Sequence, residues 1–141
     1  MAQDQVPDDF DWVAAQANCS AAAMFERLLT SVRHDVERRN LLLKEVDVKF
    51  EFEELEGGCE VSRVVPSPFT GSKVDALVRF EREGRRIHVR GEDVDVDFTA
   101  VVALDPGGVC RFVVAEAMYS EWEIRRMALE QLFFEEHDET E

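Results

Sequence analysis

The residues of this chain that are best able to do chemistry lie in one short segment, RRIHVRGEDVDVDF, residues 85–98. Basic side chains alternate with apolar ones in its first half, and aspartates do so in its second half: Arg86, His88, Arg90, Asp93, Asp95 and Asp97. A histidine beside a carboxylate can act as a general base, because the carboxylate orients and charges the imidazole. Two interpretations follow: a site for catalysis or for an anionic or metallic ligand, or a ladder of charges that neutralise one another.

Strand pairing favours the ladder. If Glu83–Gly84 and Gly91–Glu92 each form a two-residue turn, the apolar residues of three successive strands share one face, which sets the register. The polar face then reads in three rows: Glu81–Arg86–Asp97, Arg79–His88–Asp95 and Leu77–Arg90–Asp93. Each aspartate lies opposite a basic residue, and such cross-strand pairs contribute roughly 0.2–1 kcal/mol each. Neither a nucleophile nor an oxyanion donor stands beside them, so we expect a polar ladder rather than a catalytic site.

Other residues that could hold a metal or a cofactor are scattered along the sequence. The three histidines fall in a predicted helix, a predicted strand and a tail: His34, His88 and His137. Their spacing matches neither HxH nor HExxH. The three cysteines are odd in number and widely spaced, with no CxxC pair: Cys19, Cys59 and Cys110. We therefore predict neither a disulfide framework nor a metal site, and no glycine motif that would indicate a cofactor.

The charge of the chain excludes some partners. The 141 residues carry a formal net charge of −15, of which residues 12–134 account for −6. An acidic surface repels phosphates, which argues against direct nucleic-acid binding.

No apolar run is long enough to span a membrane and no signal-peptide pattern is present, so we expect a cytoplasmic protein. We also expect a disordered N-terminus over residues 1–7, one domain over residues 8–134, and an acidic disordered tail over residues 135–141.

The hydrophobic periodicity predicts the elements that carry these side chains. A short helix capped by Asp8 or Asp9 reaches residue 17, and Ser20 caps a longer helix that runs to about residue 43. At Val46 the period changes from 3.6 to 2, which indicates five antiparallel strands in a meander. A capping box, Ser120 with Glu123, begins the last helix. The sequence therefore predicts a two-layer α+β sandwich: a five-stranded antiparallel sheet with one face covered by the N-terminal and C-terminal helices.

The last helix is apolar on nearly all sides, which is more than one sheet face can cover. Its surplus forms a predicted interface: Trp122, Leu129, Phe133 and Phe134. A homodimer through this helix is the simplest use of such a surface.

We therefore predict a non-enzymatic cytosolic binding module that acts through protein–protein contacts, as an adaptor, a chaperone-like protein or an inhibitor. The alternative is a small-molecule-binding or enzymatic domain with an apolar pocket between the sheet and the long helix, next to small inward residues such as Ala76 and Ala100.

Overall fold

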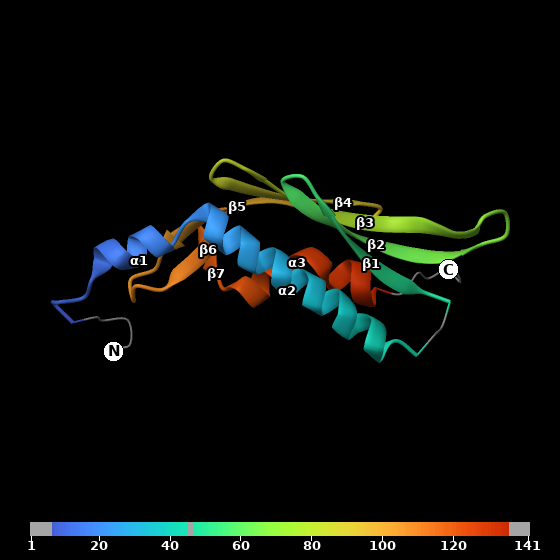
Figure 1. Cartoon of the computed structure of the whole chain (residues 1–141), viewed down its shortest axis with the longest axis horizontal. Helices are drawn as coiled ribbons and strands as arrows, with labels where there is room; N and C mark the ends of the chain where they lie inside the picture. The colour runs from blue at the N-terminus through green and yellow to red at the C-terminus, as the bar shows by residue number, and fades with distance from the viewer. Residues whose placement is uncertain (1–6, 45–46, 136–141) are drawn as a thin grey trace.

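The computed structural model describes residues 7–44 and 47–135, and shows an α+β fold (Figure 1). The predicted disordered ends, residues 1–7 and 135–141, lie outside the described residues except for Pro7 and Glu135. The elements, in chain order, are α1 (Trp12–Asn18), α2 (Ala21–Leu42), β1 (Lys49–Leu55), β2 (Gly58–Ser67), β3 (Gly71–Glu83), β4 (Arg86–Glu92), β5 (Asp97–Leu104), β6 (Cys110–Val114), β7 (Ala117–Tyr119) and α3 (Glu121–Phe134). The strands follow one another in a single antiparallel sheet, so the predicted meander is confirmed.

The sheet has seven strands rather than the five predicted. One source of the difference is β7, which the prediction joined to β6. Ala115 and Glu116 form the turn between these strands, and both have positive φ angles, 50° and 74°. That conformation normally selects glycine or asparagine, so nothing in the sequence marked the turn.

The predicted start of two helices is confirmed, and that of the first is corrected. The Ser20 hydroxyl accepts a hydrogen bond from the Ala23 N–H (3.1 Å) at the start of α2. At α3 the capping box is present, with the Ser120 N–H donating to the Glu123 carboxylate (2.8 Å). At α1 the cap is Asp11, rather than Asp8 or Asp9.

The register of the central strands differs from the prediction. The β3–β4 turn is at residues 84–85, one residue later than predicted, so Phe80 lies opposite Val89 instead of Ile87. Between β4 and β5 the chain forms a loop in place of a two-residue turn, and Ile87 lies opposite Ala100. Gly91, near the end of β4 and just before this loop, is needed there because a Cβ at this position would overlap the Val94 side chain.

Helices α2 and α3 lie against the same face of the sheet (Figure 1). The hydrophobic core lies between these helices and the sheet. Each helix buries a stripe of side chains against the strands; among those with no exposed surface are Leu28 and Val32 of α2 and Ile124 and Leu132 of α3. The small residues Ala76 and Ala100 are buried members of this core. The small residues next to which the apolar pocket was predicted are therefore part of the hydrophobic core.

A disulfide joins Cys19, at the start of α2, to Cys110 in β6, across 91 residues of sequence. The prediction of no disulfide framework is therefore wrong. Cysteines this far apart carry no local spacing signal, and only the meander brings them together.

The turn before Cys110 is held by the Asp105 carboxylate, which accepts from Arg111 Nε (2.8 Å) and from the Val109 N–H (2.9 Å). These donors, Arg111 first, hold the pKa of Asp105 below its usual value.

Replacing both bridged cysteines, as Cys19→Ser with Cys110→Ser, should lower the free energy of unfolding by up to about 4–5 kcal/mol. Closing a loop of this length removes that much conformational entropy from the unfolded chain. Urea denaturation followed by circular dichroism measures the loss. Reductant should lower the wild-type midpoint and leave the variant unchanged; a midpoint that the double substitution does not move would contradict the stabilising role.

The third cysteine, Cys59, should resist alkylation in the folded protein. Its side chain is buried, which raises the pKa of the thiol to about 12, and the Glu54 carboxylate adds to the shift. Almost no thiolate is then present at neutral pH. Mass spectrometry after iodoacetamide treatment should find Cys59 labelled in urea but unlabelled without it, and rapid labelling of the folded protein would show that this environment is open.

Candidate functional site

The predicted polar ladder exists in part, with different partners. Three ion pairs connect its strands: His88 Nε2 with Asp97 (3.5 Å), Arg90 with Glu81 (3.8 Å), and Arg79 with Glu60 of β2 (Nε to Oε2, 3.1 Å). Asp93 and Asp95 lie in the β4–β5 loop and, within the described residues, have no basic partner. The three predicted rows are therefore wrong, because they depended on the two-residue turns.

The ladder lies on the exposed face of the sheet. About 42% of the His88 side chain and 72% of that of Asp97 are open to solvent. Ion pairs at such exposure are worth little, with a median of roughly 0–1 kcal/mol. His88, Asp97 and Glu81 line none of the hollows at the ends of α2 and α3, so the candidate site lies elsewhere.

Helices α2 and α3 run in the same direction, with their C-terminal ends side by side (Figure 1). Three contacts show the alignment: Ser31 with Glu121 (3.3 Å), Asp35 with Arg125 (2.7 Å), and Arg39 with the Phe133 carbonyl (2.9 Å). Each of the two steps along α2 spans about one helical turn, whereas the steps along α3 span about one turn and then two, in the same direction. This arrangement brings together two helix ends, each of which leaves carbonyl groups without partners inside the helix.

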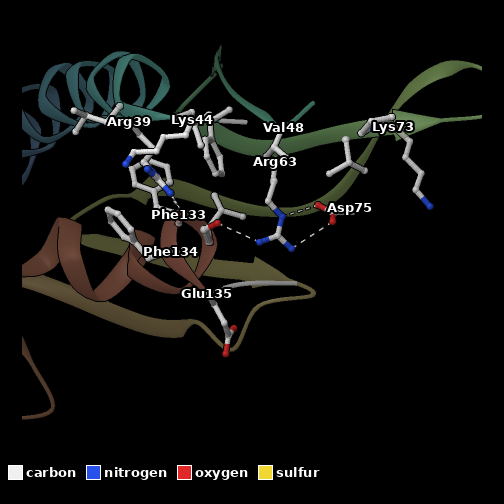
Figure 2. Close-up of a pocket in the computed structure, with 15 residues that line it drawn as sticks. Arg39, Lys44, Val48, Arg63, Lys73, Asp75, Phe133, Phe134 and Glu135 are labelled. Atoms are coloured by element: carbon white, nitrogen blue, oxygen red, sulfur yellow. Dashed lines mark hydrogen bonds and ion pairs between the residues drawn. The ribbon is translucent and has the colours of Figure 1, made fainter. Parts of the chain in front are cut away.

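Two arginines bind the last carbonyls of α3 (Figure 2). Arg39 of α2 donates through Nε and Nη2 to the Phe133 carbonyl, at 3.1 and 2.9 Å, and its guanidinium lies over the Phe134 ring. Arg63 of β2 donates to the Leu132 carbonyl (3.2 Å) and pairs with Asp75 of β3 (2.8 Å). These positive groups oppose the partial negative charge at the helix end.

A hollow of about 660 Å³ lies on the sheet side of this helix end, and we call it the sheet-side hollow. Its apolar lining comes from both helices and from β1 and β2, and its cations are Arg39, Lys44, Arg63 and Lys73. The two arginines are already bound to α3 and to Asp75. Lys73 extends away from the Arg63–Asp75 pair (Figure 2). Three of its polar side chains, Arg39, Arg63 and Asp75, are therefore bound within the fold rather than directed at a ligand.

A second hollow, the α2–α3 groove, lies between the two helices and holds about 360 Å³. Three large apolar side chains in it are more than half exposed: Leu42 (52%), Trp122 (55%) and Phe134 (60%). Its charged residues are four arginines and two carboxylates: Arg38, Arg39, Arg125, Arg126, Asp35 and Glu130. The groove therefore combines exposed apolar surface with a local charge of +2 in a chain whose net charge is −15.

The structure brings all four predicted interface residues to this groove, but not in equal positions. Trp122 and Phe134 are exposed, whereas Leu129 and Phe133 are only 2% and 9% exposed. The sequence prediction missed the contribution of α2, namely Leu42 and Arg38. The run of three leucines at residues 41–43 was the available signal, since it exceeds what one helical stripe can bury.

Arg125 crosses the groove and links the two helices. Its Nη1 donates to both carboxylate oxygens of Asp35, at 2.7 and 2.8 Å. Its Nε is buried and has no hydrogen-bond partner among residues 7–44 and 47–135. The guanidinium is thus held in place with part of its donor capacity unused.

No protein-family model, curated protein or solved structure matches this chain. None of the helices in the described ranges has the length and apolar character needed to cross a membrane. Within the same ranges, no three His, Cys, Asp or Glu side chains are grouped as metal ligands. The geometry of the groove is therefore the basis for inferring function.

Replacing Arg63 by Met should lower the free energy of unfolding by about 3 kcal/mol, because it leaves the largely buried Asp75 carboxylate and the Leu132 carbonyl without their partner. Adding Asp75→Leu should recover part of this loss by removing the unpaired charge. Urea denaturation of the two single variants and the double variant measures both effects. If the double variant loses as much free energy of unfolding as the two single variants together, the Arg63–Asp75 pair contributes no coupling free energy.

Proposed function

We propose that this protein is a non-enzymatic binding module that holds an acidic, amphipathic segment of a protein partner in the α2–α3 groove. One observation carries the proposal: exposed aromatic and aliphatic side chains lie among arginines on an otherwise acidic protein. Adaptors, chaperone-like proteins and inhibitors all act through contacts of this kind.

The apolar residues of the groove supply the affinity in this proposal. Burying a large apolar side chain contributes roughly 1.5–3 kcal/mol, so covering Trp122, Phe134 and Leu42 is favourable. Tryptophan and arginine are also the residue types that contribute most at measured interfaces. A helical segment with apolar residues at every third or fourth position fits a groove between two helices.

The charge of the groove supports an acidic partner rather than a second copy of the chain. A symmetric dimer through this groove would place four arginines against four arginines, which costs free energy. An acidic segment would instead pair with Arg38, which has no ion pair among the described residues. The predicted homodimer is therefore the competing outcome, and an acidic partner is the one that we propose.

The alternative function, a small-molecule or enzymatic pocket between the sheet and the long helix, has weaker support. The sheet-side hollow lies at that place in part, but its guanidinium groups already bind α3 and Asp75. A ligand would have to displace these contacts before it could use the same donors.

The disulfide changes the proposed location. Disulfides persist in oxidising compartments and are rare in cytosolic proteins. The Cys19–Cys110 bond therefore favours an oxidising compartment over the predicted cytoplasm.

Selection from a display library of random short peptides against the full chain tests the proposed function. Enriched peptides should combine Asp and Glu with large apolar residues at helical spacing, and should bind more weakly as salt increases. Trp122→Ser should weaken binding at least about tenfold. Trp12→Ser is the matched control, since Trp12 is exposed to a similar extent (63%, against 55% for Trp122) but lies on α1, outside the groove.

A second pair of variants tests the charge. Arg38→Glu should weaken binding of the enriched peptides, whereas Arg27→Glu should not, because Arg27 lies about 16 Å earlier along the same helix. Enrichment of basic peptides, or equal loss in the two tryptophan variants, would contradict the proposal. Sedimentation equilibrium distinguishes the homodimer: self-association that Phe134→Glu abolishes would assign the groove to a second copy.

A further inference from the structure

A cavity of about 670 Å³ lies at the opposite end of α2 from the groove, where the start of this helix meets the β3–β4 turn and β5. Its charged lining consists of three arginines: Arg82 at the end of β3, Arg85 in the turn and Arg86 at the start of β4. The described residues that line it include no carboxylate. We call it the arginine cavity.

None of these three arginines forms an ion pair with a residue that the structure describes, which distinguishes them from most of the other arginines. Seven of the 13 arginines make an ion pair among the described residues. Of the remaining six, three line this one cavity. Acidic residues outnumber basic ones by 31 to 16, so an arginine placed at random would lie near a carboxylate. Glu83 lies opposite Arg86 in the β3–β4 register, but it does not line the cavity and forms no ion pair with Arg86. Three like charges that lack an ion pair repel each other, and an anion in the cavity would reduce that cost.

The donors of the arginine cavity are available to a ligand. Arg82 donates through Nη1 to the Gly84 carbonyl (2.8 Å), which uses one of its five N–H groups and steadies the turn. The structure shows no hydrogen bond or ion pair from the Arg85 and Arg86 side chains to another described residue. Gln16 also lines the cavity, and its side-chain amide could supply a further donor.

We propose that the arginine cavity binds a small molecule that bears a phosphate or pyrophosphate group. Guanidinium groups bind phosphate oxygens through paired, charge-assisted hydrogen bonds, and several of them around one cavity favour a multiply charged anion. The volume is in the range of small-molecule sites. Cys19 lines the cavity as well, and its disulfide to Cys110 fixes the start of α2 there, so the wall is in place before a ligand binds.

Isothermal titration calorimetry of the full-length, oxidised chain with inorganic pyrophosphate at low ionic strength tests this site. We expect saturable binding to the wild type. Ala22→Glu places a carboxylate in the cavity wall and should weaken the affinity at least about tenfold. Ala23→Glu is the matched control: the next residue is also exposed, carries the same added charge in the same helical turn, and lies outside the cavity lining. It should change the affinity by less than about threefold.

Arginine variants provide a second comparison. Arg85→Gln and Arg86→Gln should each weaken pyrophosphate binding at least about tenfold, whereas Arg38→Gln, in the α2–α3 groove, should leave it unchanged. Absence of saturable binding to the wild type would overturn the proposal. So would equal losses in Ala22→Glu and Ala23→Glu, or sulfate binding as tightly as pyrophosphate. Trp122→Ser should leave pyrophosphate binding unchanged. A failure of the proposed arginine cavity can therefore be distinguished from a failure of the proposed peptide binding in the α2–α3 groove.

Discussion

The arrangement of α2 and α3 depends on how the last carbonyl groups of α3 are satisfied. Two parallel helices that end side by side bring two partial negative charges together, here in a protein of net charge −15. Arg39 from α2 and Arg63 from β2 both donate to these carbonyls, and Asp75 of β3 holds Arg63 in position. One small network therefore ties both helices to the sheet. The two guanidinium groups offset the partial negative charges of the adjacent helix ends, which stabilises the parallel arrangement.

The exposed groove follows from the same arrangement. Each helix uses its inner face for the sheet, through residues such as Val32 and Leu132, and no third layer among residues 7–44 and 47–135 covers the outer faces. Trp122 and Phe134 lie on the outer side of α3, and Leu42 continues that surface at the end of α2. A helix that is apolar on nearly all sides must leave part of its surface uncovered in a two-layer fold.

Part of this fold could be predicted from sequence because the relevant signals are local. Ser20 and the Ser120–Glu123 box mark helix starts within one turn, and the change of period at Val46 separates helix from strand. The register could not be predicted in the same way. The predicted and observed pairings of β3 with β4 differ by two residues, a shift that leaves every apolar side chain on the same face. Apolar alternation thus determines which face is buried but does not distinguish registers two residues apart.

The candidate site was predictable only where composition alone revealed it. Trp122 and Phe134 stood out because α3 has too many apolar residues, whereas Arg38 lies in a stretch of α2 where acidic and basic residues are interleaved. In the structure Arg33 of this helix pairs with Glu54, and no described carboxylate forms such a pair with Arg38. The disulfide and the arginine cavity join residues that are distant in sequence, such as Cys19 with Cys110 and Ala22 with Arg86, so no local pattern could reveal them.

The two positive regions lie at opposite ends of one rigid helix, and this placement bears on how each could act. Most of the acidic surface repels anions, so an anionic molecule is directed toward the few places where the potential is reversed. At one end the disulfide fixes the start of α2, and at the other Arg39 and Arg125 fix it against α3. Because the backbone at both ends is already held, little ordering free energy is lost when a partner binds there. A single well-anchored helix can therefore present two separate anion-attracting surfaces without a change in fold.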